Sequence, residues 1–404
     1  MKLLYIADGR SPTALNWMGY FIQAGHEVHL VSTYPCEAVP GLASMNVVPV
    51  ALSGFYGQPD GGRTTSGNIL RRYLPVGVRT RIRQLAAPLS LPRAAGAIRE
   101  VIERLQPELV HAMRIPYEGM IAAEALGKMN RSGSRPKFPL LISVWGNDFT
   151  LHAASTPVLA AYTHKSLQAA SALHTDCRRD QRLAVEMGFE ASKPKLIIPG
   201  GGGIQMDVFH PRDHQGDDAG KANAPVTIIN PRGMRAYVRN DTIFEAIPLV
   251  AEKYPDIRLV CPGMEDEQQA LHWAVENCIT DKVELLLAQT RQQMAKLFRH
   301  SLISLSITTH DGTPNSLLEA MACGCFPIAG DIESIREWIT PGENGLLVDP
   351  GDPEALAGAI LEAIGQPKLR RQAGERNLEL VGERAEYGKC MREAEEFYRK
   401  LVGK

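Results

Sequence analysis

The chain has 404 residues, of which 44% are hydrophobic and 22% are charged, and its formal net charge is −1. That length exceeds one ordinary hydrophobic core and suits two α/β domains. The near-neutral charge provides no global field for nucleic acid, so we expect no nucleic-acid partner. Seven cysteines without a C-x2-C pair indicate reduced thiols. The sequence contains no run of about 18 apolar residues, so we expect no membrane span. We therefore expect a cytoplasmic protein.

Short β-rich runs alternate with longer helical stretches along the whole chain. Several runs are apolar on both faces, as in parallel strands that are covered on both sides. Two such series predict two doubly wound α/β sheets. The expected strands, in chain order, are residues 2–8, 27–32, 46–51, 108–113, 140–146, 171–176 and 195–201 in the first series, and 226–233, 257–263, 283–288, 302–308, 326–330 and 345–350 in the second.

A stretch rich in Gly, Asp and Pro separates the two series and is typical of a linker. We expect an N-terminal domain over 1–205, a linker over 206–224 and a second domain over 225–380. A terminal helix over 381–404 is expected to pack back on the N-terminal domain. In open α/β sheets ligands bind beyond the carboxyl ends of the strands, so the loops after strands should line a cleft between the two sheets.

The stretch HDGTPNSLLEAMACGCFPIAG, residues 310–330, combines a loop with the start of a helix. Pro314 suits the first turn of that helix, and Gly324 is a signal for its end. A helix N-terminus exposes unpaired N–H groups and the positive end of the helix dipole, which suits a phosphate. Gly312 permits close approach of the backbone to a ligand.

Two carboxylates in this stretch have two interpretations each. Asp311 on the loop could meet a polar ligand or could cap the helix. Glu319 lies among apolar helix residues, where a carboxylate needs a partner such as a pair of sugar hydroxyls, or it is a solvated helix residue. The following stretch FPIAGDIESIREWI places another acidic loop at the next strand end and favours ligand binding.

The stretch DGTPNSLLEAMACGCFPIAGDIESIREWITPGENGLLVDPGDPEALAGAI resembles the donor-binding half of the family-four retaining glycosyltransferases (glycosyl transferases group 1). The shared pattern is an acidic residue, seven residues and Glu, then EAMACG and later NGLLV. The opening MKLLYIADGRSPTALNWMGYFIQAGHEVHLVS and the stretches ELVHAM, ISVWGNDF and IIPGGGGIQMDVFHP are similar to the acceptor half. The resemblance implies an α/β GT-B fold, with two doubly wound Rossmann-like domains facing a central cleft.

The resemblance also implies roles in donor binding. Asp311 would lie near the transferring sugar, where many members carry Glu, and Glu319 would hold the ribose hydroxyls. Glu337 matches a family glutamate but could equally be structural. Contacts to the sugar and diphosphate would come from Gly312, Thr313, Pro314, Asn315 and Ser316.

Basic residues follow the first strand of the second series, in INPRGMRAYVRND. Arg232 matches the family arginine that meets the diphosphate, and with Asp311 it forms the expected catalytic pair. The family lysine position is occupied by Tyr237. Arg235 or Arg239 could supply the missing cation, because guanidinium binds phosphate in a bidentate manner, or these arginines are a solvated loop.

On the acceptor side the resemblance points to five residues. Trp145 stands where many members carry a His, so a general-base or sugar-contacting histidine is absent there. Asp148 could bind the acceptor or orient its loop, and His111 could contact the acceptor or serve the core. Asn16 and Trp17, at the start of the first helix, are expected to face the cleft.

The resemblance implies a retaining transfer from a nucleotide-sugar, with a UDP-sugar favoured and a GDP-sugar next, to an acceptor hydroxyl. It implies no metal and no cofactor, with the leaving phosphate taking the acceptor proton. The acceptor would be a carbohydrate or a lipid-linked carbohydrate in polysaccharide, glycolipid or glycoconjugate synthesis. Seven arginines among apolar residues in 61–97 could contact an anionic membrane at its inner face, or form a soluble loop or a site for an anionic acceptor.

Two other functions stay open from the sequence. A nucleotide-sugar epimerase shares the GT-B fold but is not expected to carry this EAMACG pattern. A catalytically silent scaffold is suggested by the departures at Asp311, Tyr237 and Trp145. A nicotinamide dehydrogenase is disfavoured because IADGRSPTALN lacks the G-x-G-x-x-G turn.

Overall fold

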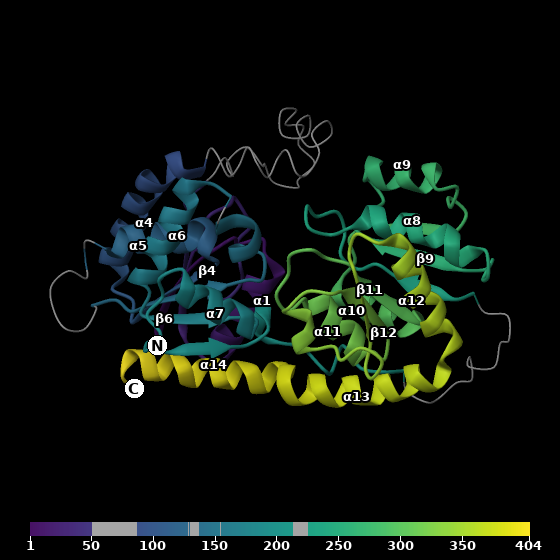
Figure 1. Cartoon of the computed structure of the whole chain (residues 1–404). Helices are drawn as coiled ribbons and strands as arrows, with labels where there is room; N and C mark the ends of the chain where they lie inside the picture. The colour runs from purple at the N-terminus through teal and green to yellow at the C-terminus, as the bar shows by residue number, and fades with distance from the viewer. Residues whose placement is uncertain (51–86, 128, 130–136, 154, 213–224) are drawn as a thin grey trace. The chain divides into compact units, whose positions relative to one another are not determined.

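The computed structural model describes residues 1–50, 87–127, 129, 137–153, 155–212 and 225–404 (Figure 1). The chain forms two compact units. Unit 1 consists of Met1–Gly202 together with Lys389–Lys404, and unit 2 is the continuous segment Gly203–Gly388. The arginine-rich part of 61–97 up to residue 86 lies outside the described residues, as does 213–224 of the expected linker.

Unit 1 contains a seven-stranded parallel sheet in the order β3-β2-β1-β4-β5-β6-β7. The strand order reverses between β1 and β4, and this switch point is where ligands bind in open α/β sheets. Its elements are β1 (Lys2–Ala7), α1 (Pro12–Gln23), β2 (Glu27–Ser32), β3 (Ser44–Val47), η2 (Ala87–Ser90), α4 (Leu91–Leu105), β4 (Leu109–Met113), η3 (Ile115–Gly119), α5 (Met120–Leu126), β5 (Leu140–Val144), η4 (Asp148–Ala153), α6 (Pro157–Ala169), β6 (Ala172–Thr175), α7 (Arg178–Glu186), β7 (Lys195–Ile197), η5 (Gly200–Gly202) and α14 (Tyr387–Val402).

The two faces of the unit 1 sheet are covered by different helices. On one face α4, α5 and α6 bury an aliphatic core that includes Leu4, Ile6 and Ile142. On the other face α1 and α14 cover a row of polar and aromatic side chains from β1, β4, β5 and β6. Helix α1 begins where the Ser11 side chain accepts a hydrogen bond from the Ala14 N–H at 3.4 Å, with Pro12 as its first residue.

Unit 2 contains a six-stranded parallel sheet in the order β10-β9-β8-β11-β12-β13. Its switch point lies between β8 and β11. Its elements are β8 (Thr227–Ile229), α8 (Asn240–Ala251), β9 (Arg258–Pro262), α9 (Gln268–Glu276), β10 (Val283–Leu286), α10 (Arg291–His300), β11 (Ile303–Ser306), α11 (Asn315–Ala322), β12 (Phe326–Gly330), η6 (Ile335–Glu337), β13 (Leu346–Val348), α12 (Pro353–Gly365) and α13 (Pro367–Ala385).

The prediction of two doubly wound parallel sheets is confirmed. Each of the 13 strands among the described residues overlaps one expected strand. In unit 2 one apolar cluster joins α8 and α12 to the sheet, and a second joins α10, α11 and α13 to the opposite face. Burial on both faces explains why these strands are continuous apolar runs in the sequence.

The expected domain boundaries differ from the observed units. Residues 206–212 are not a free linker, because Phe209 is buried against Phe298 in the core of unit 2. The expected terminal helix is two helices, since the extended backbone of Glu386 separates α13 from α14. Helix α13 packs on α11 in unit 2, whereas all but the first two residues of α14 belong to unit 1.

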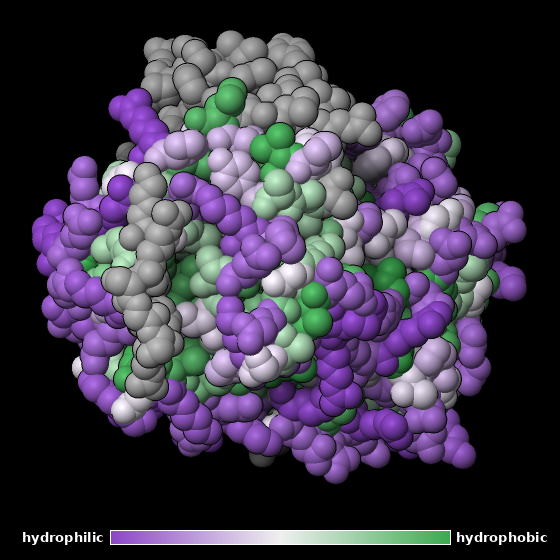
Figure 2. Space-filling view, turned by 60° about the vertical axis from the view of Figure 1, so that its left-hand side comes forward, coloured by the Kyte–Doolittle hydropathy of each residue, from purple (hydrophilic) through white to green (hydrophobic). Residues whose placement is uncertain are grey.

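No helix in the described part of the chain is both long and apolar enough to cross a membrane. On the face that Figure 2 brings forward, hydrophilic residues cover most of the described surface and apolar residues form small groups. One such exposed apolar residue in unit 1 is Leu89 in η2, with 86% of its surface exposed.

Candidate functional site

The loops after β8 and β11 lie side by side at the switch point of unit 2. The two strands pair in parallel, with Ile303 opposite Ile228, so their carboxyl ends lie at one edge of the sheet. An antiparallel bridge between Val238 and Thr308 joins the two loops directly. The loops therefore form the position where the fold predicts a ligand.

Arg232 and Asp311 form an ion pair across these two loops. The second terminal nitrogen of Arg232, Nη1, donates to Ser316 Oγ at 3.3 Å. The side chains of Arg232 and Asp311 are only 10% and 13% exposed. Burial alone would lower the pKa of Arg232, but attraction to Asp311 outweighs it and raises that pKa. Arg232 Nε is buried without a hydrogen-bond partner among the described residues, so the guanidinium has a donor left for a ligand.

The loop that carries Asp311 is held from the neighbouring loop after β12. Ser334 Oγ donates to the backbone oxygen of Asp311 at 2.6 Å, and Trp338 Nε1 donates to Thr313 Oγ1 at 2.9 Å. Sequence reasoning did not identify Ser334 or Trp338, although both lie in the second acidic loop that it singled out. Glu337 is the last residue of η6, directly before Trp338, and is half-buried. Its backbone oxygen accepts from Arg384 Nη1 at 2.8 Å.

The N-terminus of α11 is directed at the same place. Pro314 occupies the N-cap position, and no side chain caps the helix. Uncapped N–H groups at a helix start favour an anion. Asn315 Oδ1 is buried there without a hydrogen-bond partner among the described residues. Gly324, with φ +82°, follows the last turn as its sequence signal predicted.

Glu319 lies one turn further along α11 and is half-buried. Burial raises the pKa of its carboxyl from 4.5 to about 7, against attraction to Arg291 and Arg232. Arg291, at the start of α10, donates to Gln205 Oε1 at 2.8 Å. Arg291 was not identified from the sequence, because its proximity to Glu319 depends on the packing of α10 against α11.

The candidates for the missing cation differ in their surroundings. Arg235 is exposed, and its Nε donates to the backbone oxygen of Arg232 at 2.9 Å. Arg239 is paired with Asp241 through three contacts of 2.9 to 3.1 Å, so its charge is already balanced. The ring of Tyr237 lies 5.9 Å from the Arg232 guanidinium carbon and can support that cation.

In unit 1 the prediction that Trp17 faces a cleft is wrong. Trp17 is fully buried, and its Nε1 donates to Tyr398 OH at 2.9 Å. Its ring centroid lies 4.6 Å from that of His174. Position 17 faces the sheet, since the Trp17 ring contacts those of His111 on β4 and His174 on β6. The neighbouring Asn16 donates through Nδ2 to the backbone oxygen of Gly201 at 2.7 Å.

The prediction that His111 contacts an acceptor is also wrong, and its alternative role in the core is confirmed. His111 is 1% exposed and shares a hydrogen bond with Tyr398 OH through Nδ1. Its Nε2 lies 2.7 Å from Ser143 Oγ, which lies 2.7 Å from His174 Nδ1. Burial lowers the pKa of His174 to about 4 and that of His111 well below its ordinary value, so both rings are neutral. His174 Nε2 then donates to the backbone oxygen of Ile198 at 2.9 Å, which fixes the direction of the whole chain of hydrogen bonds.

Asp148 orients its loop and is too buried for direct acceptor contact, so its assignment to acceptor binding is wrong. Its exposed fraction is 0%, and its carboxylate accepts from Arg114 Nε at 2.9 Å and from the Trp145 N–H at 3.0 Å. Burial raises the pKa of Asp148 despite the Arg114 cation. Trp145 itself is partly exposed at the carboxyl end of β5. Of the five acceptor-side candidates, Asn16 and Trp145 are those that the structure leaves partly exposed.

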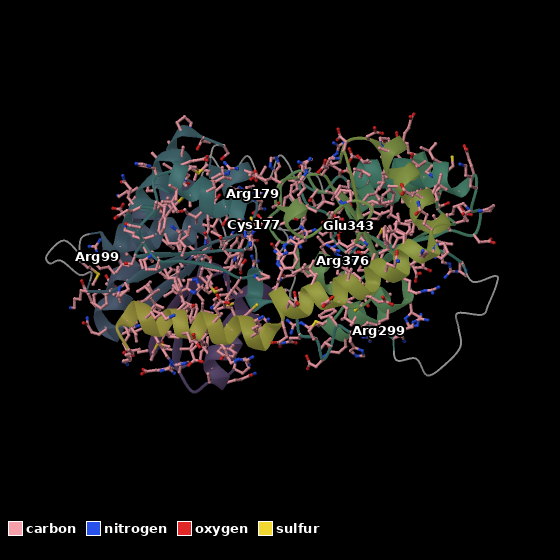
Figure 3. All side chains as sticks on the ribbon, turned by 60° about the horizontal axis from the view of Figure 1, so that its bottom comes forward. Arg99, Cys177, Arg179, Arg299, Glu343 and Arg376 are labelled. Carbon is pink, nitrogen blue, oxygen red and sulfur yellow. The ribbon has the colours of Figure 1, made fainter. Side chains whose placement is uncertain are left out.

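A second set of buried charges holds the turn that carries Trp145. Arg179 Nη2 donates to the Gly146 backbone oxygen at 2.7 Å, while the Gly146 N–H donates to Asp176 Oδ2 at 3.3 Å. Arg179 and Cys177 lie at the start of α7 (Figure 3). Asp176, Cys177 and Asp180 could together offer ligand atoms to a metal. However, Arg179 already pairs with Asp180, and burial raises the pKa of the Cys177 thiol, so the cluster suits a structural role.

Two Rossmann-like units, each a doubly wound parallel sheet, define a two-domain fold of the GT-B class. Two family models match the chain. Residues 9–200 match the Glycosyl transferase 4-like domain, and residues 214–379 match Glycosyl transferases group 1. The chain belongs to the group 1 glycosyl transferases and is an enzyme of that family.

Relatives and solved structures agree with this assignment. The chain is 23% identical over 286 residues to the putative glycosyltransferase EpsD of Bacillus subtilis, covering 69% of this chain and 73% of that protein. Sucrose-phosphate synthase from Thermosynechococcus elongatus superposes with a TM-score of 0.72 at 16% identity, over 100% of both chains. Anabaena HepE in complex with UDP superposes with a TM-score of 0.69 at 14% identity, over 98% of this chain and 99% of that one.

Proposed function

We propose that this protein is a retaining glycosyltransferase that moves a sugar from a nucleotide-sugar to an acceptor hydroxyl without a divalent metal. A UDP-sugar is the favoured donor, because the similar HepE structure contains UDP, and a GDP-sugar is the next candidate. The product would belong to polysaccharide, glycolipid or glycoconjugate synthesis. A nucleotide-sugar epimerase is not favoured, since both family models describe glycosyl transferases.

The observation that carries this proposal is the convergence of Arg232, Asp311 and Ser316 at the uncapped start of α11. A diphosphate leaving group needs positive charge and N–H donors that are fixed before reaction. Arg232 supplies the charge, and the start of α11 supplies the donors. Glu319, one turn into the same helix, is spaced to hold the ribose hydroxyls.

The proposed reaction assigns proton transfer to the substrate itself. The acceptor hydroxyl attacks the anomeric carbon from the face that the diphosphate leaves, and the departing phosphate oxygen takes the acceptor proton. Arg232 and α11 stabilise the negative charge that develops on that phosphate. Asp311 would contact the transferring sugar.

Calorimetric titration with UDP, GDP and ADP, in the presence of EDTA, tests the proposal. We expect one nucleotide to bind with micromolar affinity and its sugar donors to be hydrolysed slowly without acceptor. Binding that requires a divalent metal would contradict the proposed mechanism. No binding by any of the three would favour the catalytically silent scaffold.

The acceptor is proposed to bind unit 1 near Trp145, which is partly exposed and whose backbone N–H donates to Asp148. It is expected to be a carbohydrate, free or lipid-linked. Sedimentation with vesicles containing anionic lipid tests peripheral membrane contact. Vesicle binding that persists in 1 M salt would contradict an electrostatic contact, because screening is then nearly complete.

A further inference from the structure

The donor cluster of unit 2 carries its own counter-charges. The cations Arg232 and Arg291 lie near two carboxylates, Asp311 and Glu319. The position that resembles the family lysine is Tyr237, which adds no charge. Asp311 and the partly charged Glu319 therefore offset part of the positive charge that a nucleoside diphosphate, with two or three negative charges, would meet at Arg232 and Arg291.

Of the two cations, Arg232 is the one whose charge is balanced by a direct ion pair, with Asp311. Arg232 directs one terminal nitrogen to Asp311 and the other to Ser316, and both partners of the ion pair are about nine-tenths buried. Charges attract strongly in such surroundings because little water screens them. The third guanidinium nitrogen of Arg232, Nε, is buried and has no hydrogen-bond partner among the described residues.

We propose that Asp311 is an internal competitor for the donor diphosphate. In the ligand-free protein its carboxylate occupies Arg232, and an arriving diphosphate takes over that cation. The inference rests on the proposed function, because it needs a nucleoside diphosphate to bind at α11. It makes Asp311 a residue that limits donor affinity, in addition to any contact with the sugar.

An alternative role for Asp311 predicts the opposite effect. If the carboxylate only holds Arg232 in position, its loss would leave the guanidinium disordered and weaken nucleotide binding. The two roles are therefore separated by the sign of a single change in affinity. Free nucleotides are the suitable probes, because they lack the sugar that Asp311 could also contact.

The test compares Asp311→Asn with the unaltered protein by calorimetric titration of UDP, GDP and ADP. We expect the nucleotide that binds the unaltered protein to bind the variant about tenfold more tightly, a value between exposed and buried ion pairs. Glu343→Gln is the matched control, since it removes the same charge from the exposed Arg376 pair in the same unit, at residues with no proposed part in donor binding. Its affinity should stay unchanged. Equal or weaker binding by Asp311→Asn overturns the inference.

A double-variant comparison shows whether the effect acts through Arg232. In an Arg232→Gln background, Asp311→Asn should give no gain in affinity, whereas a gain that persists there would overturn direct competition. Circular dichroism and thermal unfolding establish that each variant is folded. If the Asn variant does not fold, Asp311→Ser replaces it, because its hydroxyl can still accept the Gly312 N–H that Asp311 Oδ1 accepts at 3.1 Å.

The outcomes separate this inference from the proposed function. If none of the three nucleotides binds either the unaltered protein or Asp311→Asn, the proposed function is contradicted and the inference with it. Binding of one nucleotide with the same affinity to both proteins keeps the proposed function and removes only the competition.

Discussion

At the scale of single residues, the proposed role of Glu319 in nucleotide binding implies a loss of stability in the protein without nucleotide. Its carboxyl is half-buried on α11, and burial raises its pKa to about 7. A charged carboxylate there is costly in the ligand-free protein, because Arg291 and Arg232 attract it without replacing the water it has lost. Two ribose hydroxyls would supply those hydrogen bonds, so the cost is recovered when a nucleotide binds.

Glu319→Gln should therefore shift stability and affinity in opposite directions. At pH 8 we expect the free energy of unfolding of the variant without nucleotide to be higher by roughly 1 kcal/mol, which raises its unfolding temperature. Its nucleotide affinity should fall about 10- to 100-fold, because hydrogen bonds to a charged acceptor contribute about 1.5–3 kcal/mol. Thermal unfolding and titration of the same samples provide both numbers. A variant that is both less stable and fully able to bind would contradict this role.

The same carboxyl predicts a pH dependence of stability. Its pKa in the folded protein, about 7, lies above the ordinary value of 4.5, so the folded state holds the proton more tightly between these values. Stability from this group is therefore present below about pH 4.5 and declines as the pH rises through 7. Denaturant unfolding at pH 5.5, 7 and 8.5 measures the decline, and Glu319→Gln should remove that part of it.

Asp311→Ala is expected to reduce turnover without weakening donor binding. If Asp311 lies beside the transferring sugar as proposed, its carboxylate acts mainly on charge that develops in the transition state, and kcat should fall by about 10²-fold, as it does when one oxyanion-hole donor is removed. Nucleotide release from the donor sugar, measured over a range of donor concentrations, gives kcat and KM separately. Glu343→Ala, which breaks the exposed pair with Arg376, is the control, and a mainly raised KM in Asp311→Ala would identify a binding role instead.

At the scale of elements, α14 completes the core of unit 1. Its Tyr398 hydroxyl accepts from Trp17 and Tyr5, and it meets the ring of His111, which lies 287 residues earlier in the sequence. Phe21 also stacks on the Tyr398 ring at 4.5 Å. This helix therefore closes a face of the sheet that the N-terminal segment leaves incomplete.

Tyr398→Phe should destabilise unit 1 by about 1–3 kcal/mol, because it leaves buried polar groups of Trp17 and His111 without their partner. Urea unfolding followed by tryptophan fluorescence measures the change. Tyr20→Phe is the matched control, since its hydroxyl donates to Glu395 at 3.1 Å in a more exposed place. Equal effects of the two substitutions would argue against the buried network.

The same elements show what the sequence could predict. Apolar periodicity identified the strands because each is covered on both faces, and the helix signals at Pro314 and Gly324 were local. The burial of Trp17, His111 and Asp148 could not be predicted in that way. It depends on contacts with Tyr398 and Arg114, which are distant in sequence, whereas the resemblance assigned each residue a role one at a time.

At the scale of the whole molecule, the site was predicted better in unit 2 than in unit 1. Arg232, Asp311 and Ser316 come together because β8 and β11 are neighbours, which the doubly wound order implies. The pairing of Arg232 with Asp311 was not predicted, since the resemblance assigned Arg232 to the diphosphate and Asp311 to the sugar. Unit 1 is built from two separate segments of the chain, and unit 2 is one continuous segment between them.

This arrangement predicts two unfolding transitions in the calorimetry of the full chain, because each unit has its own buried core. A nucleotide at about 100 times its Kd adds about 2.7 kcal/mol to the unit that binds it. For a unit of this size that corresponds to roughly 5–10 °C. The nucleotide should raise only the transition of unit 2, and Tyr398→Phe should lower only that of unit 1. A single transition that nucleotide raises as a whole would show instead that the two units unfold as one cooperative body.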